Sequence, residues 1–370
     1  MRIPRRSLIK LGVLAIAPLL LAGCSAAVGL DGPATTINPA GDQARRILDL
    51  MVPIFWMALV VFIVVEGILV YTVFRFRRKP NAPIPSQIQG NTQIEIAWTI
   101  APALIAVVIA VLTFRTQADN AVLPPNAIHI TAVGHQWWFE FQYPDGGPEG
   151  KPLLTASDMY IPVGKPVIIT LKGQDVIHNF WVPKLAGKTY MIPGKTNYLS
   201  FTAEQAGIYH AVCSEFCGEA HALMRFRVIA LPPDQYDRWL TQAQVAPANP
   251  PTGVGELNGD PTRGQAIFLD AKRQCITCHA ISGTAAKGVV GPNLTYYGSR
   301  TTIAAGLLDN TPENLAKWLH NPSSLKPGNL MGRVITPDWV KQNLAEQDIA
   351  DLVAYLRSMK LSVDMPVASK

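Results

Sequence analysis

The chain has 370 residues, of which 49% are hydrophobic, and carries a formal net charge of +6. This length allows two or three domains. The apolar residues are concentrated in a few segments, so we expect membrane-spanning helices beside any globular domain. No aromatic-basic RNA-binding motif accompanies the positive charge, which argues against a nucleic-acid partner.

The first segment, residues 1–23, has a basic start, a short apolar run and small residues at its end. This pattern predicts a secretory signal peptide. Its ending, Leu21-Ala22-Gly23-Cys24, resembles a bacterial lipobox. The resemblance implies cleavage before Cys24 and lipidation of its thiol, with an ordinary signal and an incidental cysteine as the alternative.

A spacer over residues 24–46 precedes a predicted helical hairpin over residues 47–118. Met51–Phe74 and Ile96–Phe114 are apolar runs long enough to cross a bilayer core of about 30 Å. The basic cluster Arg75–Lys79 marks the cytoplasmic side, so both ends of the hairpin lie outside. Glu66 interrupts the first run and is expected to face a neighbouring helix.

Residues 119–232 predict a β-rich domain. Alternating apolar segments over residues 128–133, 166–171, 196–201, 207–212 and 224–229 predict strands, separated by Gly- and Pro-containing turns. Many short strands at this spacing indicate a sandwich or a barrel.

The segment Cys213–Met224, which we call the copper loop, lies between the last two predicted strands. It holds two cysteines, a histidine and a methionine, and these soft ligands suit copper. A disulfide or a zinc site is the alternative. Met224 disfavours zinc, because a weak thioether ligand is typical of copper electron-transfer sites. His178 offers a further ligand.

The copper loop resembles that of subunit II of cytochrome c oxidase, which binds a binuclear copper centre (CuA). The family pattern C-x-E-x-C-x3-H-x2-M is present, and the upstream histidine is 35 residues before the first cysteine (213 − 178 = 35). The resemblance implies a Greek-key cupredoxin fold and six copper ligands: His178, Cys213, Glu215 (through its backbone carbonyl), Cys217, His221 and Met224. It also implies that the two cysteines bridge the coppers and that the Glu215 carboxylate binds magnesium at the border with subunit I.

Two further residues gain a role from the same resemblance. Trp137, in Gly134-His135-Gln136-Trp137, holds the position at which electrons reach copper in the family, although Phe139 stands where a second tryptophan is common. Glu95 holds the position of a glutamate near the entrance of a proton path into subunit I. A plain interfacial carboxylate is the alternative for Glu95.

A Pro-rich linker is predicted over residues 233–258, with a short helix near Tyr236–Ala243. Residues 259–370 follow with Cys275-Ile276-Thr277-Cys278-His279, the attachment sequence of c-type haem. The two thiols can bond to one haem, and the adjacent histidine can bind its iron.

Helical patterns over residues 262–271, 313–320 and 346–360 accompany this motif, and the segment resembles a small class I cytochrome c. Gly291–Leu294 resembles the loop that supports the iron-binding histidine, His279. The second iron ligand is expected to be Met331, placed on a loop. Met359 and His320 are the alternatives.

The chain is thus expected to be multidomain: a transmembrane hairpin, an all-β cupredoxin-like domain and an all-α cytochrome c domain. This order resembles the caa-type subunit II of a bacterial respiratory oxidase, in the plasma membrane with both metal domains on its outer face. The resemblance implies electron flow from an external cytochrome c or a quinol–cytochrome c reductase, through haem c and CuA, to subunit I. There, with other subunits present, oxygen reduction is coupled to proton translocation; this chain has no oxygen-reducing site.

Two alternatives stay open from sequence. A nitric oxide reductase can use a similar copper subunit, and the chain could instead be a free-standing membrane-anchored electron carrier. The catalytic partner separates these hypotheses.

Overall fold

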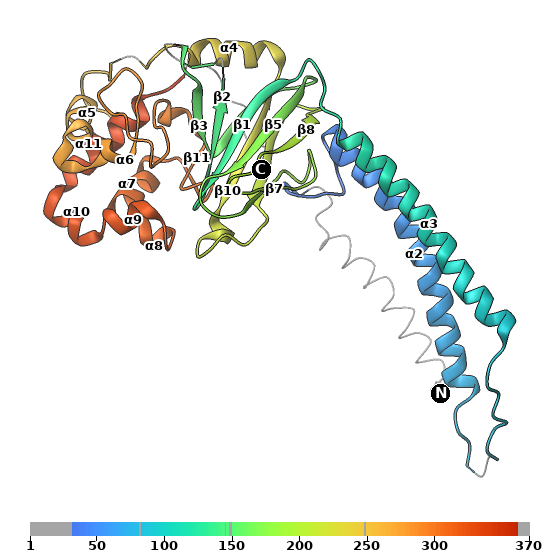
Figure 1. Ribbon diagram of the computed structural model, residues 1–370. Helices are drawn as coiled ribbons and strands as arrows, with labels where there is room; N and C mark the ends of the chain where they lie inside the picture. Colours follow the sequence, from blue (N-terminus) through green and yellow to red (C-terminus); the bar gives the residue numbers. More distant parts are fainter. Residues whose placement is uncertain (1–31, 81–82, 145, 148–149, 248, 362–370) are drawn as a thin grey trace, which may run out of the picture. The chain divides into compact units, whose positions relative to one another are not determined.

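The computed structural model describes residues 32–80, 83–144, 146–147, 150–247 and 249–361 (Figure 1). The predicted signal peptide and Cys24 lie outside the described residues. The chain divides into two compact units, of which one is Arg45–Val122 and the other comprises the residues before and after it.

The unit Arg45–Val122 is a helical hairpin. It contains most of α2 (Asp42–Arg75) and all of α3 (Thr92–Asn120). Both helices are long and apolar enough to cross a membrane, and they extend beyond the two predicted apolar runs. The side chain of Asn91 starts α3 by accepting hydrogen bonds from the backbone N–H groups of Gln93 and Ile94.

Glu66 lies in a groove between these two helices. The groove has a volume of about 390 Å³ and is lined by Ile105 and Ile109 of α3 and by apolar residues of α2. Glu66 is the only ionisable residue in its lining. Glu66 itself is exposed, and that its carboxyl group faces a neighbouring helix stays a prediction.

The second unit begins its globular part with a β-sandwich, here called the sandwich domain. Its strands are β1 (Ile128–His135), β2 (Trp138–Tyr143), β3 (Leu153–Ala156), β4 (Asp158–Pro162), β5 (Pro166–Gly173), β6 (His178–Trp181), β7 (Thr189–Met191), β8 (Asn197–Thr202), β9 (Gly207–Cys213) and β10 (Arg225–Leu231). One sheet has the order β3-β2-β1-β5-β8 and the other β4-β10-β9-β6-β7. The five strands predicted from sequence are β1, β5, β8, β9 and β10.

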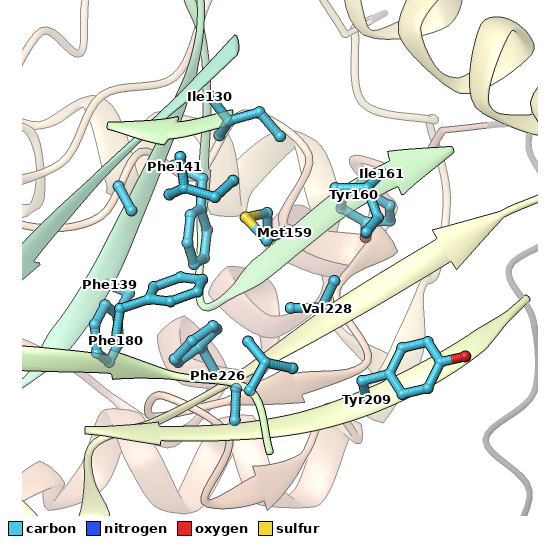
Figure 2. Packing of buried hydrophobic residues seen from close by; sticks show 14 of the residues in the cluster. Ile130, Phe139, Phe141, Met159, Tyr160, Ile161, Phe180, Tyr209, Phe226 and Val228 are labelled. Atoms are coloured by element: carbon cyan, nitrogen blue, oxygen red, sulfur yellow. The ribbon is translucent and has the colours of Figure 1, made fainter. Parts of the chain in front are cut away.

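The core of the sandwich domain is rich in phenylalanine (Figure 2). The ring centroid of Phe226 lies 4.5 Å from that of Phe139 and 4.7 Å from that of Phe180. These residues come from β10, β2 and β6, so the cluster joins both sheets. Phe139 is fully buried, which confirms that it is a packing residue.

Helix α4 (Pro233–Ala243) is the helix predicted within the linker, and it packs on the sandwich domain. Trp239 is 1% exposed and stacks on Tyr160 at a centroid distance of 4.5 Å. The hydroxyl of Tyr296, from the following domain, bonds to the Ala243 carbonyl at 2.9 Å. The first part of the linker therefore contacts both the sandwich domain and the domain that follows it.

The last part of the chain is the helical domain. Its elements are η3 (Glu256–Asn258), α5 (Pro261–Leu269), η4 (Ala271–Arg273), α6 (Cys275–Cys278), η5 (Tyr297–Ser299), β11 (Thr302–Ile303), β12 (Leu308–Asp309), α7 (Pro312–His320), α8 (Pro322–Leu325), α9 (Leu330–Val334), α10 (Pro337–Asn343) and α11 (Glu346–Ser358). The three predicted helices are α5, α7 and α11. Gly264 lets α5 approach α11, since a Cβ there would lie 2.0 Å from the Asp351 carbonyl oxygen.

The sandwich and helical domains belong to the same compact unit and share direct contacts. The backbone N–H of Arg225 donates to the Ala305 carbonyl at 3.2 Å, and the Arg227 guanidinium donates to the Thr301 hydroxyl at 3.0 Å. Beside them Asp158 is only 2% exposed. Its oxygen Oδ2 accepts a long hydrogen bond of 3.4 Å from the Thr301 N–H, and Oδ1 has no partner among the described residues.

We expect Phe226→Ala to lower the free energy of unfolding by about 3–5 kcal/mol, because it removes the ring that joins the two sheets. Thermal or chemical unfolding of the full chain in detergent measures the change. Tyr198→Ala, at an exposed position of β8, is the control. Equal losses in both variants would contradict this account of the core.

A second prediction concerns Asp158. Burial raises the pKa of its carboxyl group from 3.8 to about 6, against the opposing effects of Arg300 and Arg227. Because folding favours the protonated form, the stabilisation is fully present below pH 3.8 and is lost as the pH rises through about 6. Roughly 3 kcal/mol should disappear over that interval.

Asp158→Asn should remove this part of the pH dependence, because the amide does not ionise. Chemical unfolding of the full chain at a series of pH values from 4 to about 7 measures it. The exposed Asp237→Asn is the matched control and should keep the wild-type slope. A wild-type slope in Asp158→Asn would show that the carboxyl group titrates normally.

Candidate metal and haem sites

The copper loop is closed at its base by antiparallel pairing of β9 and β10. Val212 pairs with Arg225, and the N–H of Cys213 donates to the Met224 carbonyl at 3.0 Å. The two ends of the loop are therefore fixed by backbone hydrogen bonds, and its ligand side chains must lie close together.

The sulfur atoms of the loop converge. Cys213 Sγ lies 3.8 Å from Cys217 Sγ and 3.3 Å from the Glu215 carbonyl oxygen. Cys217 Sγ in turn lies 3.6 Å from His221 Nδ1 and 3.7 Å from Met224 Sδ. The disulfide alternative does not apply, because bonded sulfurs are about 2.05 Å apart.

His178 reaches this cluster from β6, which pairs with β9 so that Phe180 lies opposite Cys213. Its Nδ1 lies 4.0 Å from Cys213 Sγ, and its Nε2 lies 2.7 Å from the Asp175 carboxylate. The Asp175 contact fixes the ring with Nδ1 directed toward the sulfurs. The Asp175 carboxylate also accepts a hydrogen bond from the Gln136 N–H at 2.7 Å.

The two thiols are electrostatically coupled. The hydrogen bond between the two thiols lowers the pKa of Cys213 to about 3 and raises the pKa of Cys217. The pair therefore holds one proton, which a metal ion would displace. Two thiolates, two imidazoles, a thioether and a carbonyl form a donor set that fits copper.

Trp137 lies directly beside the copper loop. Pairing of His135 with Trp138 leaves Gln136 and Trp137 in the connection between β1 and β2. The indole is 6% exposed, and its Nε1 donates to the Cys217 carbonyl at 2.9 Å. The Gln136 amide donates to the same carbonyl at 2.8 Å.

The haem motif forms a single helical turn, α6, followed by His279. His279 Nδ1 donates to the Pro292 carbonyl at 2.8 Å, which leaves Nε2 for iron. Burial lowers the pKa of His279, which favours the neutral ring that binds a metal. Gly291 is required here, because a Cβ would lie 2.6 Å from the imidazole.

The three candidates for the second iron ligand differ in their surroundings. Met331 is half-buried and lies in the short helix α9, so the expectation that it lies on a loop was wrong. The side chain of Asn329 starts this helix by accepting a hydrogen bond from Gly332 at 2.7 Å. Met359 is 4% exposed within the hydrophobic core, and His320 pairs with Glu346 at 3.3 Å.

Glu95 lies in the first turn of α3, where its carboxylate accepts a hydrogen bond from the Asn91 N–H at 3.2 Å. This contact gives Glu95 a structural role at the helix start. Sequence reasoning missed Asp175, Gln136 and the buried Lys326. Asp175 had a local signal, since it stands three residues before His178.

These features define a membrane-anchored electron-transfer chain with a copper domain and a haem domain. Residues 37–116 match the transmembrane domain of cytochrome c oxidase subunit II, residues 148–231 its periplasmic domain, and residues 261–360 cytochrome c. The chain belongs to the cytochrome c oxidase subunit II family, carries a fused cytochrome c domain, and is an electron-accepting component of a haem-copper oxidase. The expected cupredoxin-like fold is confirmed.

Two relatives cover most of the chain. The chain is 37% identical over 350 residues to cytochrome c oxidase subunit 2 of Alkalihalophilus pseudofirmus, covering 93% of this chain and 94% of that protein. It is 35% identical to the same subunit of Bacillus sp. (strain PS3), covering 78% and 80%. The periplasmic domain of the Bradyrhizobium japonicum subunit covers 33% of this chain and 96% of its own, at 29% identity and a TM-score of 0.31.

We expect Asp175→Asn to weaken copper binding by roughly 10–100-fold, because the amide is a poorer partner for His178. Competition between the full chain and a copper chelator measures this affinity. Asp234→Asn, on the exposed side of α4, should bind copper like the wild type. An unchanged affinity in Asp175→Asn would show that the carboxylate does not orient the ligand.

Proposed function

We propose that this chain takes electrons from an external donor at a c-type haem and passes them through a binuclear copper centre to subunit I. Bound copper and haem supply one-electron carriage. The observation that carries the proposal is the convergence of sulfur and imidazole donors in the copper loop, at separations of 3.6–4.0 Å, beside Trp137.

The copper ligands in this proposal are His178, Cys213, the Glu215 carbonyl, Cys217, His221 and Met224. The thiolates of Cys213 and Cys217 would hold the metal ions together with these ligands. Support comes from the 3.8 Å contact between the two sulfur atoms, which would become two thiolate ligands when metal binds.

The haem is held through Cys275 and Cys278, with His279 and Met331 as iron ligands. His279 has a fixed ring and a free Nε2. Met331 is favoured because Met359 is a core residue and His320 is engaged with Glu346. Thioether coordination raises the reduction potential of such a haem.

Trp137 is the point at which electrons reach copper. Its indole is buried and bonded to the backbone of Cys217, so it offers a short path to a bridging ligand. The Gln136 amide donates to the same Cys217 carbonyl at 2.8 Å.

Two further residue roles depend on subunit I. The half-buried Glu215 carboxylate binds magnesium together with subunit I, and Glu95 leads protons toward subunit I. The chain lies in a bacterial plasma membrane, with both metal domains on the outer face and Cys24 lipidated. The basic residues that follow α2 support this orientation. The external donor is a cytochrome c or a quinol–cytochrome c reductase.

The test combines EPR and optical spectroscopy of the full chain. We expect a mixed-valence two-copper signal together with the absorption of a low-spin haem that has His and Met ligands. A mononuclear copper signal would contradict the proposed binuclear centre.

Met331→Ala should remove the His–Met absorption but leave the covalent haem and the copper signal, because only one iron ligand is lost. Optical spectra of the reduced and oxidised full chain measure this. Met359→Leu is the control, since a volume-conserving change in the core should keep the absorption. Survival of the absorption in Met331→Ala would shift the assignment to Met359.

A further inference from the structure

Lys326 is a buried lysine in the helical domain, and among the described residues its amino group has no carboxylate partner. It is 3% exposed. Burial lowers the pKa of its amino group to about 7, against the opposing effect of Cys217. A lysine is rarely buried to this extent without a role, because leaving water is costly for its charge.

The amino group of Lys326 joins the two domains. Nζ donates to the carbonyl of Trp137 at 2.6 Å and to that of Ala304 at 3.1 Å. The first acceptor belongs to the sandwich domain and the second to the helical domain. Gly328, two residues after Lys326, lies beside the Trp137 indole, since a Cβ on Gly328 would be 3.1 Å from Cη2 of Trp137.

The backbone of Lys326 is coupled to the helix that carries Met331. Asn329 is 6% exposed, and its side-chain amide donates to the Lys326 carbonyl. The side-chain oxygen of Asn329 accepts from the Gly332 N–H at 2.7 Å and so caps α9. One buried side chain therefore connects Lys326 to the start of the Met331 helix.

A second contact between the two domains is made by the turn at Ala304 and Ala305. Ala304 and Ala305 both have left-handed backbone conformations, with φ of 54° and 64°. This turn presents the Ala304 carbonyl to Lys326 and the Ala305 carbonyl to the N–H of Arg225, the residue after Met224. The helical domain thus bonds to the backbone at Trp137 and at the end of the copper loop.

We propose that Lys326 is a positioning residue that fastens the Met331 segment to the backbone of Trp137, so that electrons pass from haem to copper within a docked pair of domains. The inference rests on the proposed function. The transfer moves one electron from the reduced haem iron to the oxidised copper pair, with no bond made or broken and no proton moved. The external donor replaces that electron.

The test is the rate of electron transfer from haem to copper in the full chain after flash photoreduction of the haem. Lys326→Met leaves two buried carbonyls without their donor, which should weaken docking roughly 10–100-fold. We expect the internal rate to fall at least about tenfold and to become sensitive to viscosity, as in a tethered encounter. Copper and haem spectra and their reduction potentials should stay at wild-type values.

Lys341→Met is the matched control, since Lys341 is an exposed lysine on α10 of the same domain, and it should transfer at the wild-type rate. A small ruthenium complex can reduce copper directly, without the haem. The rate of this direct reduction should be the same in all variants. If Lys326→Met fails to incorporate haem or copper, the internal transfer rate of Gly328→Ala is measured as the test instead. Its added methyl group presses against Trp137 and Glu219 and should also slow the transfer.

A wild-type internal rate in Lys326→Met with both centres intact would overturn the inference but leave the proposed function standing. The absence of haem-to-copper transfer in the wild-type chain would instead refute the proposed function. Slow transfer in Lys326→Met together with slow direct reduction of copper would also overturn the inference, because it would locate the damage in the copper site.

Discussion

The pairing of β6, β9 and β10 is the constraint on which the rest of the site depends. The β9–β10 ladder closes the base of the copper loop through the Cys213–Met224 backbone hydrogen bond of 3.0 Å. The β6–β9 ladder places Phe180 opposite Cys213 and so brings His178 to the same point. Both ladders consist of backbone hydrogen bonds, so they position these ligands without a bound metal ion. Ligands positioned by strand pairing suit an electron carrier, because its ligands should move little when the metal changes charge.

The surroundings of the copper loop are organised by hydrogen bonds to backbone carbonyls. The Cys217 carbonyl accepts from both Gln136 and Trp137, and the Trp137 carbonyl accepts from Lys326. Backbone acceptors hold neighbouring segments without adding charge near the metal. The same kind of contact orients His279 through the Pro292 carbonyl in the helical domain. Apart from the Glu215 carbonyl, both metal sites therefore take their ligands from side chains, and backbone carbonyls orient much of their surroundings, with Asp175 as a charged partner of His178.

The sequence predicted the elements whose signal is local. Both apolar helices, five of the sandwich strands and three helices of the helical domain were found, because each follows from periodicity within one segment. Short strands such as β6 and β7 were not predicted, since three or four residues carry too little pattern. Met331 was placed on a loop, and the structure puts it in α9, because the Asn329 side chain supplies a helix start that periodicity does not reveal.

By itself the sequence determined the chemistry of this protein: the ligand types, their spacing in the copper loop and the haem motif, and two segments able to span a membrane. These are properties of neighbouring residues, and covalent spacing limits where such side chains can go. Only the tertiary structure decided that Asp175 orients His178, that Trp137 bonds to Cys217, and that Lys326 reaches Trp137 across 189 positions of sequence. The Lys326 contact depends on how two separately folded domains meet, and no local pattern encodes that packing.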